Sequence, residues 1–210
     1  MAEKRSYYVS VAGVLGSGKT TACRLLATAL GFHLFEENVS ENVFLRKFYK
    51  DPHRWALHSQ LFYVREKADQ LKRIKTLLEN SSVVQDSPLY QDYLTYAKAQ
   101  HHLGHMTDEE FVLYEKIFHV LNRDLPAPDL IIQLDASPEV THSRIARRGR
   151  AYEQSIGLPY IALLTELQKK WLKENSYLNI LSFDTNTLDL AANPKHKNQF
   201  IETVRERLNI

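Results

Sequence analysis

The chain has 210 residues, of which 44% are hydrophobic and 25% are charged, and its formal net charge is +2. This is an ordinary globular composition, and a charge so close to zero argues against nucleic acid or a membrane as the main partner. No apolar run approaches the roughly 20 residues that cross a bilayer, and residues 1–6 leave no room for a signal or transit peptide before the first predicted strand. Cys23 is the only cysteine, so we expect no intrachain disulfide and a cytoplasmic location.

Strand-like and helix-like segments alternate along the chain. Short runs rich in β-branched and aromatic residues predict strands over 7–12, 32–35, 82–85, 130–135 and 178–183. Helices are predicted over 21–30, 42–78 with a turn at 50–52, 90–102, 107–123, from 137 onward, 159–174 and 199–208, whereas 194–198 is expected to be a loop. This alternation predicts an α/β fold, with a five-stranded parallel sheet flanked by helices, and a single domain over residues 1–210.

A phosphate-binding motif lies between the first predicted strand and the helix after it. Gly13-Val-Leu-Gly16-Ser-Gly18-Lys19-Thr20 matches G-x-x-x-x-G-K-[ST]. The glycines let successive backbone N–H groups turn toward one anion, Lys19 reaches the β- and γ-phosphates, and the Thr20 hydroxyl ligates Mg²⁺. We therefore expect ATP and Mg²⁺ as cofactors, bound by Gly13, Gly16, Ser17, Gly18, Lys19, Thr20 and Thr21.

Acidic residues follow the second and third predicted strands. The carboxyl ends of parallel strands meet at one crevice in a sheet of this kind. Asp86, at the end of the third strand, is a candidate second anchor for Mg²⁺, although an Asp there also suits a simple turn. Glu36 and Glu37 follow the second strand, where a carboxylate can take the proton from an acceptor hydroxyl or be a solvated loop acid. No N-K-x-D guanine-reading motif occurs, which counts against a GTPase.

Four arginines near residue 147 predict a lid over ATP. Arg144, Arg147 and Arg148 are spaced i, i+3 and i+4, so they share one helix face, and Gly149 is a possible hinge before Arg150. Such a cluster can stabilise charge on a phosphoryl group in transfer, where an arginine contributes about 10³ to 10⁵ in rate. A solvated basic helix face is the alternative.

These motifs, in this order, resemble the deoxynucleoside kinases, most closely the bacterial deoxyadenosine/deoxyguanosine kinase branch, over about residues 9–184. The resemblance implies the three-layer P-loop kinase fold, with a lid over about residues 144–155. It also implies that Glu37 is the catalytic glutamate, which accepts the proton of the 5′-hydroxyl, and that the protein is a homodimer.

The resemblance assigns further residues to the sugar and to the phosphates. Tyr49-Lys-Asp-Pro-His-Arg-Trp55 looks like the Y-x-x-P-x-R-W stretch, whose Tyr contacts the sugar 3′-hydroxyl. In the segment from Arg144 to Glu153, similar to the lid signature, the Glu joins Tyr49 at that hydroxyl. The residues expected to clamp phosphates and to act in catalysis with Glu37 and Lys19 are Arg144, Arg148 and Arg150.

The base and the adenine of ATP are assigned in the same way. Gln60 falls on a glutamine that holds the base through two amide contacts, and Lys67 falls where some relatives carry a base-reading arginine. Asp92 and Tyr96 fall on the base-reading acid and the ring that stacks on the base. Asp184 lies in a segment that looks like the loop around the adenine of ATP.

Two positions depart from the family pattern. The family has an arginine after the acid that ends the third strand, and Ser87 stands there; the family usually has a proline after the catalytic Glu, and Asn38 stands there. A serine cannot supply a guanidinium fork. Either another cation replaces the arginine, with Arg65 and Lys67 as candidates, or the activity is weak or lost.

The predicted function is ATP-dependent phosphorylation of a deoxynucleoside 5′-hydroxyl. Asp92, an acceptor when ionised, favours purine deoxynucleosides or deoxycytidine over thymidine. The expected partners are ATP and a small-molecule deoxynucleoside, with neither nucleic acid nor membrane. Two alternatives remain open: a weak or silent nucleotide-binding accessory protein of the same fold, and a nucleoside monophosphate kinase.

Overall fold

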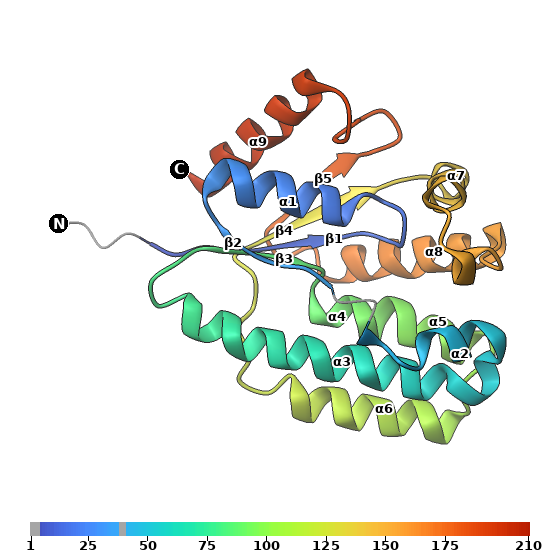
Figure 1. Cartoon of the computed structure of the whole chain (residues 1–210). Coiled ribbons are helices and arrows are strands. Elements are labelled where there is room, and N and C mark those ends of the chain that lie inside the picture. Colours follow the sequence, from blue (N-terminus) through green and yellow to red (C-terminus); the bar gives the residue numbers. More distant parts are fainter. Residues whose placement is uncertain (1–4, 38–40) are drawn as a thin grey trace.

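In the computed structural model, which describes residues 5–37 and 41–210, five parallel strands form one sheet. Their order across the sheet is β2-β3-β1-β4-β5 (Figure 1). The predicted α/β fold with a five-stranded parallel sheet is confirmed, whereas Asn38 lies outside the described residues. The strands are Tyr8–Ala12 (β1), His33–Phe35 (β2), Val83–Asp86 (β3), Leu130–Asp135 (β4) and Ile180–Asp184 (β5).

Strand β1 lies at the centre of the sheet and is buried along its whole length. Its Val11 pairs with Asp86 of β3 on one side and with Ile132 of β4 on the other. Successive side chains of a strand point to opposite faces. Val9 and Val11 accordingly join the core beneath α1, whereas Tyr8 joins the core on the α3 side. An apolar strand buried on both faces is what a helix-covered parallel sheet requires.

Helices cover both faces of this sheet, which gives three layers (Figure 1). α1 and α9 contact each other on one face, while α3 and α8 lie on the other and α6 packs outside α3. No helix among the described residues combines the length and the apolar character of a membrane span. The helices are Lys19–Leu30 (α1), Leu45–Lys50 (α2), Pro52–Leu77 (α3), Leu89–Gln91 (α4), Lys98–His102 (α5), Asp108–Leu121 (α6), Pro138–Arg148 (α7), Leu158–Glu174 (α8) and Pro194–Leu208 (α9).

The start of α9 differs from the prediction of a loop over residues 194–198. The Asn193 side chain caps this helix by accepting hydrogen bonds from the backbone N–H groups of Lys195 and His196. Pro194 occupies the first turn, where a missing N–H leaves no helical hydrogen bond unmade. These two capping residues outweigh the polar character of the segment.

The helix predicted over residues 90–102 is divided in three. A π-helical segment, Asp92–Ala97 (η2), separates α4 from α5. Such segments are rare and often occur at functional sites, because the extra residue re-aims the side chains around it. Here the segment carries Asp92 and Tyr96, two of the predicted base-binding residues.

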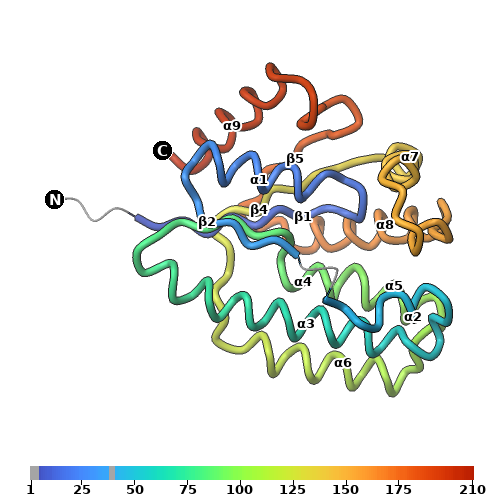
Figure 2. Tube along the Cα trace, viewed as in Figure 1, coloured from blue at the N-terminus to red at the C-terminus, as the bar shows by residue number. Residues whose placement is uncertain are grey.

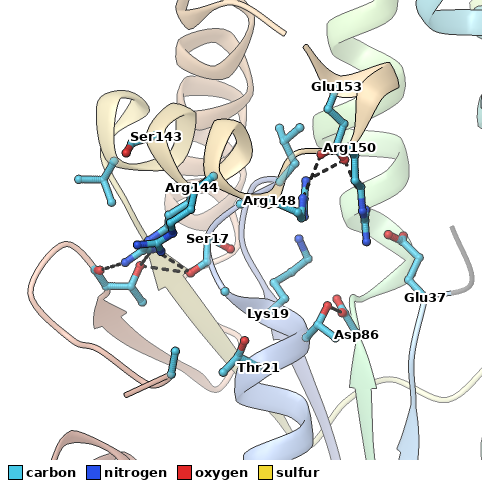
Figure 3. A pocket seen from close by; sticks show the side chains of 18 of the residues that line it. Ser17, Lys19, Thr21, Glu37, Asp86, Ser143, Arg144, Arg148, Arg150 and Glu153 are labelled. Atoms are coloured by element: carbon cyan, nitrogen blue, oxygen red, sulfur yellow. Dashed lines mark hydrogen bonds and ion pairs between the residues drawn. The ribbon is translucent and has the colours of Figure 1, made fainter. Parts of the chain in front are cut away.

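The predicted lid lies beyond the carboxyl ends of the strands. Helix α7 and the 3₁₀ segment Ala151–Glu153 (η3) lie at the same end of the molecule as α2, while the C-terminus lies at the opposite end (Figure 2). This arrangement places the arginines of α7 above the loop that joins β1 to α1 (Figure 3).

Candidate active site

A cavity of about 1210 Å³ opens at the carboxyl ends of the strands. Its walls come from α1, α3, the lid and the segment that follows β5 (Figure 3). Three predicted site residues, Gly13, Lys67 and Asp184, are not among the described residues that line it. The predicted residues that do line it are Gly16, Ser17, Gly18, Lys19, Thr20, Thr21, Glu37, Tyr49, Gln60, Asp86, Asp92, Tyr96, Arg144, Arg148, Arg150 and Glu153.

The loop between β1 and α1 has the backbone of an anion cradle. Gly18, immediately before α1, has a φ of 106°, which an L side chain rarely adopts. Lys19 is the first residue of α1, and its Nζ donates a hydrogen bond across the loop to the carbonyl oxygen of Val14 at 3.3 Å. The partial positive charge of the helix N-terminus adds to that of Lys19. The loop is therefore suited to a polyphosphate.

Gln91, a residue that the sequence reasoning missed, supports this loop from behind. Its buried side chain accepts a hydrogen bond from Gly13 N–H and donates one to Gly13 C=O, both at 2.9 Å. Gly13 therefore acts through its backbone rather than by lining the cavity. Nothing in the local sequence distinguishes Gln91 from other helical glutamines, because its partner is 78 residues away.

Thr20 and Asp86 meet at the base of the cavity. The Thr20 hydroxyl donates a hydrogen bond to Asp86 Oδ2 at 2.6 Å. The other carboxylate oxygen, Oδ1, is buried and accepts no hydrogen bond from residues 5–37 or 41–210. Burial raises the pKa of Asp86 above its ordinary value. An unsatisfied carboxylate oxygen beside a hydroxyl fits Mg²⁺, which keeps several waters and needs few protein ligands.

The neighbouring acids Glu36 and Glu37 have different partners. Arg24 of α1 binds Glu36 through two hydrogen bonds, one of them 2.8 Å long between Nη2 and Oε2. This contact lowers the pKa of Glu36. Glu37 instead has its Oε1 3.3 Å from Lys67 Nζ, and its side chain faces Arg150 of the lid (Figure 3). Of the two acids, Glu37 is thus the one directed toward the cations of the cavity.

Lys67 lies behind the cavity wall rather than on its surface. Its side chain is 2% exposed. Its Nζ donates a hydrogen bond to Ser87 Oγ at 2.8 Å and lies 3.1 Å from Asp92 Oδ2. Burial opposes the charge, but the carboxylates of Asp92 and Glu37 outweigh it and raise the pKa of Lys67. Lys67, predicted as a substrate-binding residue, therefore does not line the cavity among the described residues. Arg65, the other candidate cation, pairs with acids of its own helix.

The acceptor end of the cavity combines polar and aromatic side chains. Gln60 Oε1 is buried and accepts no hydrogen bond within the described part of the chain, whereas the buried Asp92 Oδ2 is ion-paired with Lys67. Burial raises the pKa of Asp92 to about 6. The rings of Tyr49 and Tyr152 lie 5.6 Å apart between centroids. An unsatisfied amide oxygen and a buried carboxylate near aromatic rings suit a flat ligand that carries N–H donors. Aromatic lining residues that the sequence reasoning missed are Phe48, Tyr63, Tyr152 and Tyr160.

The lid arginines divide into two groups. Arg148 donates two hydrogen bonds to the buried carboxylate of Glu153, and Arg150 donates a third at 3.4 Å. The side chains of Arg148 and Arg150 lie above Lys19 and line the cavity (Figure 3). Arg144 instead donates to the carbonyl oxygen of Ser17 at 3.4 Å and to the side chain of Thr185 at 3.1 Å. Arg144 therefore connects the phosphate loop to the segment after β5.

Asp184, predicted to lie in the adenine loop, is not brought to the cavity. Strand β5 extends one residue beyond the prediction, so Asp184 is its last residue and pairs with Asp135 of β4. Its carboxylate accepts hydrogen bonds from the backbone and side chain of Asn186, at 2.9 and 2.6 Å, in an exposed turn. Residues 185–192 line the cavity in its place.

The chain is similar to several known proteins in sequence and in structure. The family model described as "Deoxynucleoside kinase" matches residues 9–209. A deoxyadenosine/deoxycytidine kinase of Bacillus subtilis (strain 168) is 31% identical over 185 residues, which cover 87% of this chain and 84% of the relative. A deoxyguanosine kinase of the same strain is 28% identical over 205 residues, covering 95% and 96%. The solved structure of deoxyadenosine kinase from M. mycoides with bound dATP has a TM-score of 0.83 and 26% identity, covering 97% of this chain and 100% of that one.

Proposed function

The chain belongs to the deoxynucleoside kinase family and is a phosphotransferase, and from this premise we propose that it transfers the terminal phosphoryl group of ATP to the 5′-hydroxyl of a deoxynucleoside. The observation that carries the proposal is that one cavity is lined by Lys19 of the phosphate cradle, by Glu37 and by the acceptors Gln60 and Asp92. Curated relatives named for deoxyadenosine, deoxyguanosine and deoxycytidine support a deoxynucleoside as the acceptor.

Glu37 is the proposed general base. Its carboxylate accepts the proton of the 5′-hydroxyl while the oxygen of that group bonds to the γ-phosphorus in line with the bond that breaks. ADP leaves with the electron pair of the broken bond. Lys19, Arg148 and Arg150 donate hydrogen bonds to the phosphoryl oxygens, where charge is redistributed in the transition state. All four side chains line the same cavity.

Thr20 and Asp86 are the proposed Mg²⁺ residues. The unsatisfied Asp86 Oδ1 beside the Thr20 hydroxyl supports this assignment. When bound there, the ion would neutralise charge on the β- and γ-phosphate oxygens. Ser17, Gly18 and the backbone of the cradle then hold the remaining phosphate oxygens.

Gln60, Asp92 and Tyr96 are the proposed base-binding residues, and Tyr49 with Glu153 the sugar-binding pair. Gln60 presents a buried oxygen without a hydrogen bond from the described residues, and Asp92 presents a buried carboxylate that is paired with Lys67. Exocyclic amino groups of adenine and cytosine can satisfy such oxygens, and guanine offers N–H donors of its own. Thymine brings a methyl group toward the charge of Asp92, which disfavours it. Purine deoxynucleosides and deoxycytidine are accordingly favoured over thymidine as substrates.

The site gives less support to the two alternative functions. A nucleoside monophosphate kinase needs cations around the acceptor phosphate, and Glu37, Gln60 and Asp92 provide none. A silent accessory protein was suggested by the missing arginine, yet Lys67 brings a positive charge to Ser87 and Glu37.

A homodimer is also proposed, because an apolar face of α6 is open. Val112 is 46% exposed, Leu113 48% and Val120 68%, and these side chains share one side of the helix. Light scattering during size-exclusion chromatography gives the mass directly, and a Val120→Lys variant should lower it from dimer to monomer. The lid over residues 144–155, the single domain over residues 1–210 and the cytoplasmic location stay predictions.

One assay tests the function. Purified protein with Mg-ATP is offered the four deoxynucleosides, their ribose counterparts and their monophosphates, and products are separated by chromatography. We expect 5′-monophosphates of deoxyadenosine, deoxyguanosine or deoxycytidine, with the lowest kcat/KM for thymidine. Product from monophosphates alone, or from none of the acceptors, would overturn the proposal.

A further inference from the structure

The family resemblance places an arginine at residue 87, where this chain has a serine, and the structure brings a cation to Ser87 from another element. Lys67 comes from α3, whereas Ser87 follows β3. The Lys67 ammonium donates a hydrogen bond to the serine hydroxyl at 2.8 Å. The Lys67 side chain thus brings a positive charge to Ser87, a neutral residue that lies 20 positions later in the chain.

Lys67 is also placed between the two acids with the most important proposed roles. Its Nζ lies 3.3 Å from Glu37 Oε1 and 3.1 Å from Asp92 Oδ2. It is the one lysine or arginine in the described residues that is fully buried, while Asp86 and Asp92 are buried acids. Arg150 also faces Glu37, but it lines the cavity as a lid residue, as Lys19 does in the phosphate loop. No second cation inside the wall competes with Lys67 within residues 5–37 and 41–210.

We propose that Lys67 is a positioning residue that holds both the proton-accepting carboxylate of Glu37 and the base-reading carboxylate of Asp92, and so replaces the arginine absent at position 87. This inference rests on the proposed kinase function. It makes one cation serve two ends of the substrate, because Glu37 acts at the 5′-hydroxyl and Asp92 at the base.

Sharing a cation has a kinetic consequence. Removing the charge leaves two carboxylates without their ion pair, so each is free to turn away or to take up a proton. Loss of Glu37 orientation lowers kcat, and loss of Asp92 orientation raises KM for the nucleoside. A variant of Lys67 should therefore change both parameters, whereas variants of Glu37 and Asp92 should each change mainly one.

The test compares Lys67→Met, Lys67→Met/Ser87→Arg and Lys72→Met with the wild-type chain. Lys72 lies on the same helix, is 63% exposed and pairs only with Asp69 among the described residues, so it controls for loss of a lysine from α3. For Lys67→Met we expect kcat to fall about 10²-fold and KM for deoxyadenosine to rise about tenfold, since a general base and a buried charge pair are both disturbed. For Lys72→Met both stay within about twofold, as a surface ion pair contributes little.

The double variant separates the two roles. An arginine from residue 87 approaches Glu37 from the end of the neighbouring strand, since β3 pairs with β2. We expect kcat to recover at least tenfold over Lys67→Met while KM stays high, a split that a purely structural role of Lys67 would not produce. Each variant is first checked for folding by circular dichroism.

The outcomes are distinct. A folded Lys67→Met variant with wild-type kcat and KM overturns the inference and leaves the kinase function intact, whereas an inactive wild-type chain overturns both. If Lys67→Met does not fold, a folded and active double variant supports the inference. A double variant that is folded but inactive, or that also fails to fold, overturns it, because an arginine at position 87 would then be unable to replace Lys67.

Discussion

The Arg148 guanidinium donates two hydrogen bonds to the Glu153 carboxylate, at 2.9 and 2.8 Å, across the turn that follows α7. The carboxylate is almost fully buried, with its side chain 6% exposed, whereas that of Arg148 is 35% exposed. The pair therefore fixes the arginine by its Nε and one Nη, and leaves the remaining N–H donors directed at the cavity. Only a planar fork can do both at once.

For this reason, replacing Arg148 with Lys should lower the catalytic rate severely. A lysine keeps the charge but loses the second contact to Glu153 and the geometry of the fork. We expect kcat to fall about 10²-fold or more, toward the 10³ that a phosphate-clamping arginine contributes. Arg65→Lys is the matched control, because Arg65 pairs with Glu66 and Asp69 outside the cavity. Steady-state kinetics of the two variants test this prediction, and equal kcat values for Arg148→Lys and Arg65→Lys would refute the role assigned to Arg148.

The two adjacent glutamates give a second matched pair. Glu37→Gln keeps size and hydrogen bonding but removes the proton acceptor, so we expect nucleoside binding to survive and kcat to fall about 10²-fold or more. Glu36→Gln only weakens the ion pair with Arg24, which is 63% exposed, and should change kcat by less than about threefold. Calorimetry reports binding and initial rates report turnover. A Glu37→Gln enzyme as fast as the wild type would show that another group is the base.

Much of the fold was predictable because its determinants are local. The central strands are short apolar runs, such as Leu130–Asp135, between turn residues, and the phosphate motif is contiguous. The prediction of a loop over residues 194–198 was wrong because it considered the polar character of this segment without Asn193, whose side chain caps the helix. The π-helical turn at Asp92–Ala97 has no comparable sequence pattern, since it depends on packing against α3 and α8.

The site was predictable where the motif itself carries the chemistry, and not where the partner is distant. Lys19 and Thr20 follow from spacing alone. The choice between Glu36 and Glu37 depends on Arg24 of α1, and the role of Lys67 depends on three elements meeting behind one wall. Gln91 was missed for the same reason, because only the folded chain brings it to Gly13.

The pH dependence of base recognition should follow Asp92. Burial raises its pKa to about 6, so the carboxylate is ionised above that pH and takes up a proton as the pH falls through it. Protonation converts an acceptor into a donor and removes a partner of Lys67. We expect kcat/KM for deoxyadenosine to fall as the pH is lowered from 7 to 5. Asp92→Asn, which does not titrate, should lose this part of the profile; an unchanged profile would assign the acid limb to another group.

The proposed contact of Tyr49 with the 3′-hydroxyl can be isolated with a modified sugar. Removing the hydroxyl in Tyr49→Phe should lower kcat/KM for deoxyadenosine about three- to tenfold, the value of one hydrogen bond. The same variant should treat 2′,3′-dideoxyadenosine as the wild type does, because that substrate has no 3′-hydroxyl to lose. Tyr177→Phe, at a tyrosine that is 80% exposed, is the control. An equal loss on both sugars would mean that Tyr49 acts through packing with Tyr152 instead.

The phosphate loop makes a prediction about stability at Gly13. Its φ is 145°, and a Cβ added there would lie 2.7 Å from the carbonyl oxygen of Leu134, a backbone atom that cannot easily move. Gly31, at the end of α1, also has a positive φ, of 68°, but a Cβ there meets nothing within 4 Å. Gly31→Ala therefore carries only the strain of a left-handed backbone, about 1 kcal/mol. Gly13→Ala adds steric overlap to that strain, and we expect its free energy of unfolding to fall by about 3 kcal/mol.

Urea unfolding of both glycine variants, with and without Mg-ATP, tests this difference. The clash at Gly13 displaces the backbone that Gln91 holds at 2.9 Å, so the cradle should lose its shape as well as its stability. A ligand that binds only the folded chain raises the unfolding midpoint, and raises it more the more tightly it binds. Mg-ATP should therefore raise the midpoint of Gly31→Ala as it does that of the wild type, and raise that of Gly13→Ala little or not at all. Equal midpoints for the two variants would show that Leu134 yields to the added methyl group, and that the close approach of these strands is not what requires glycine at residue 13.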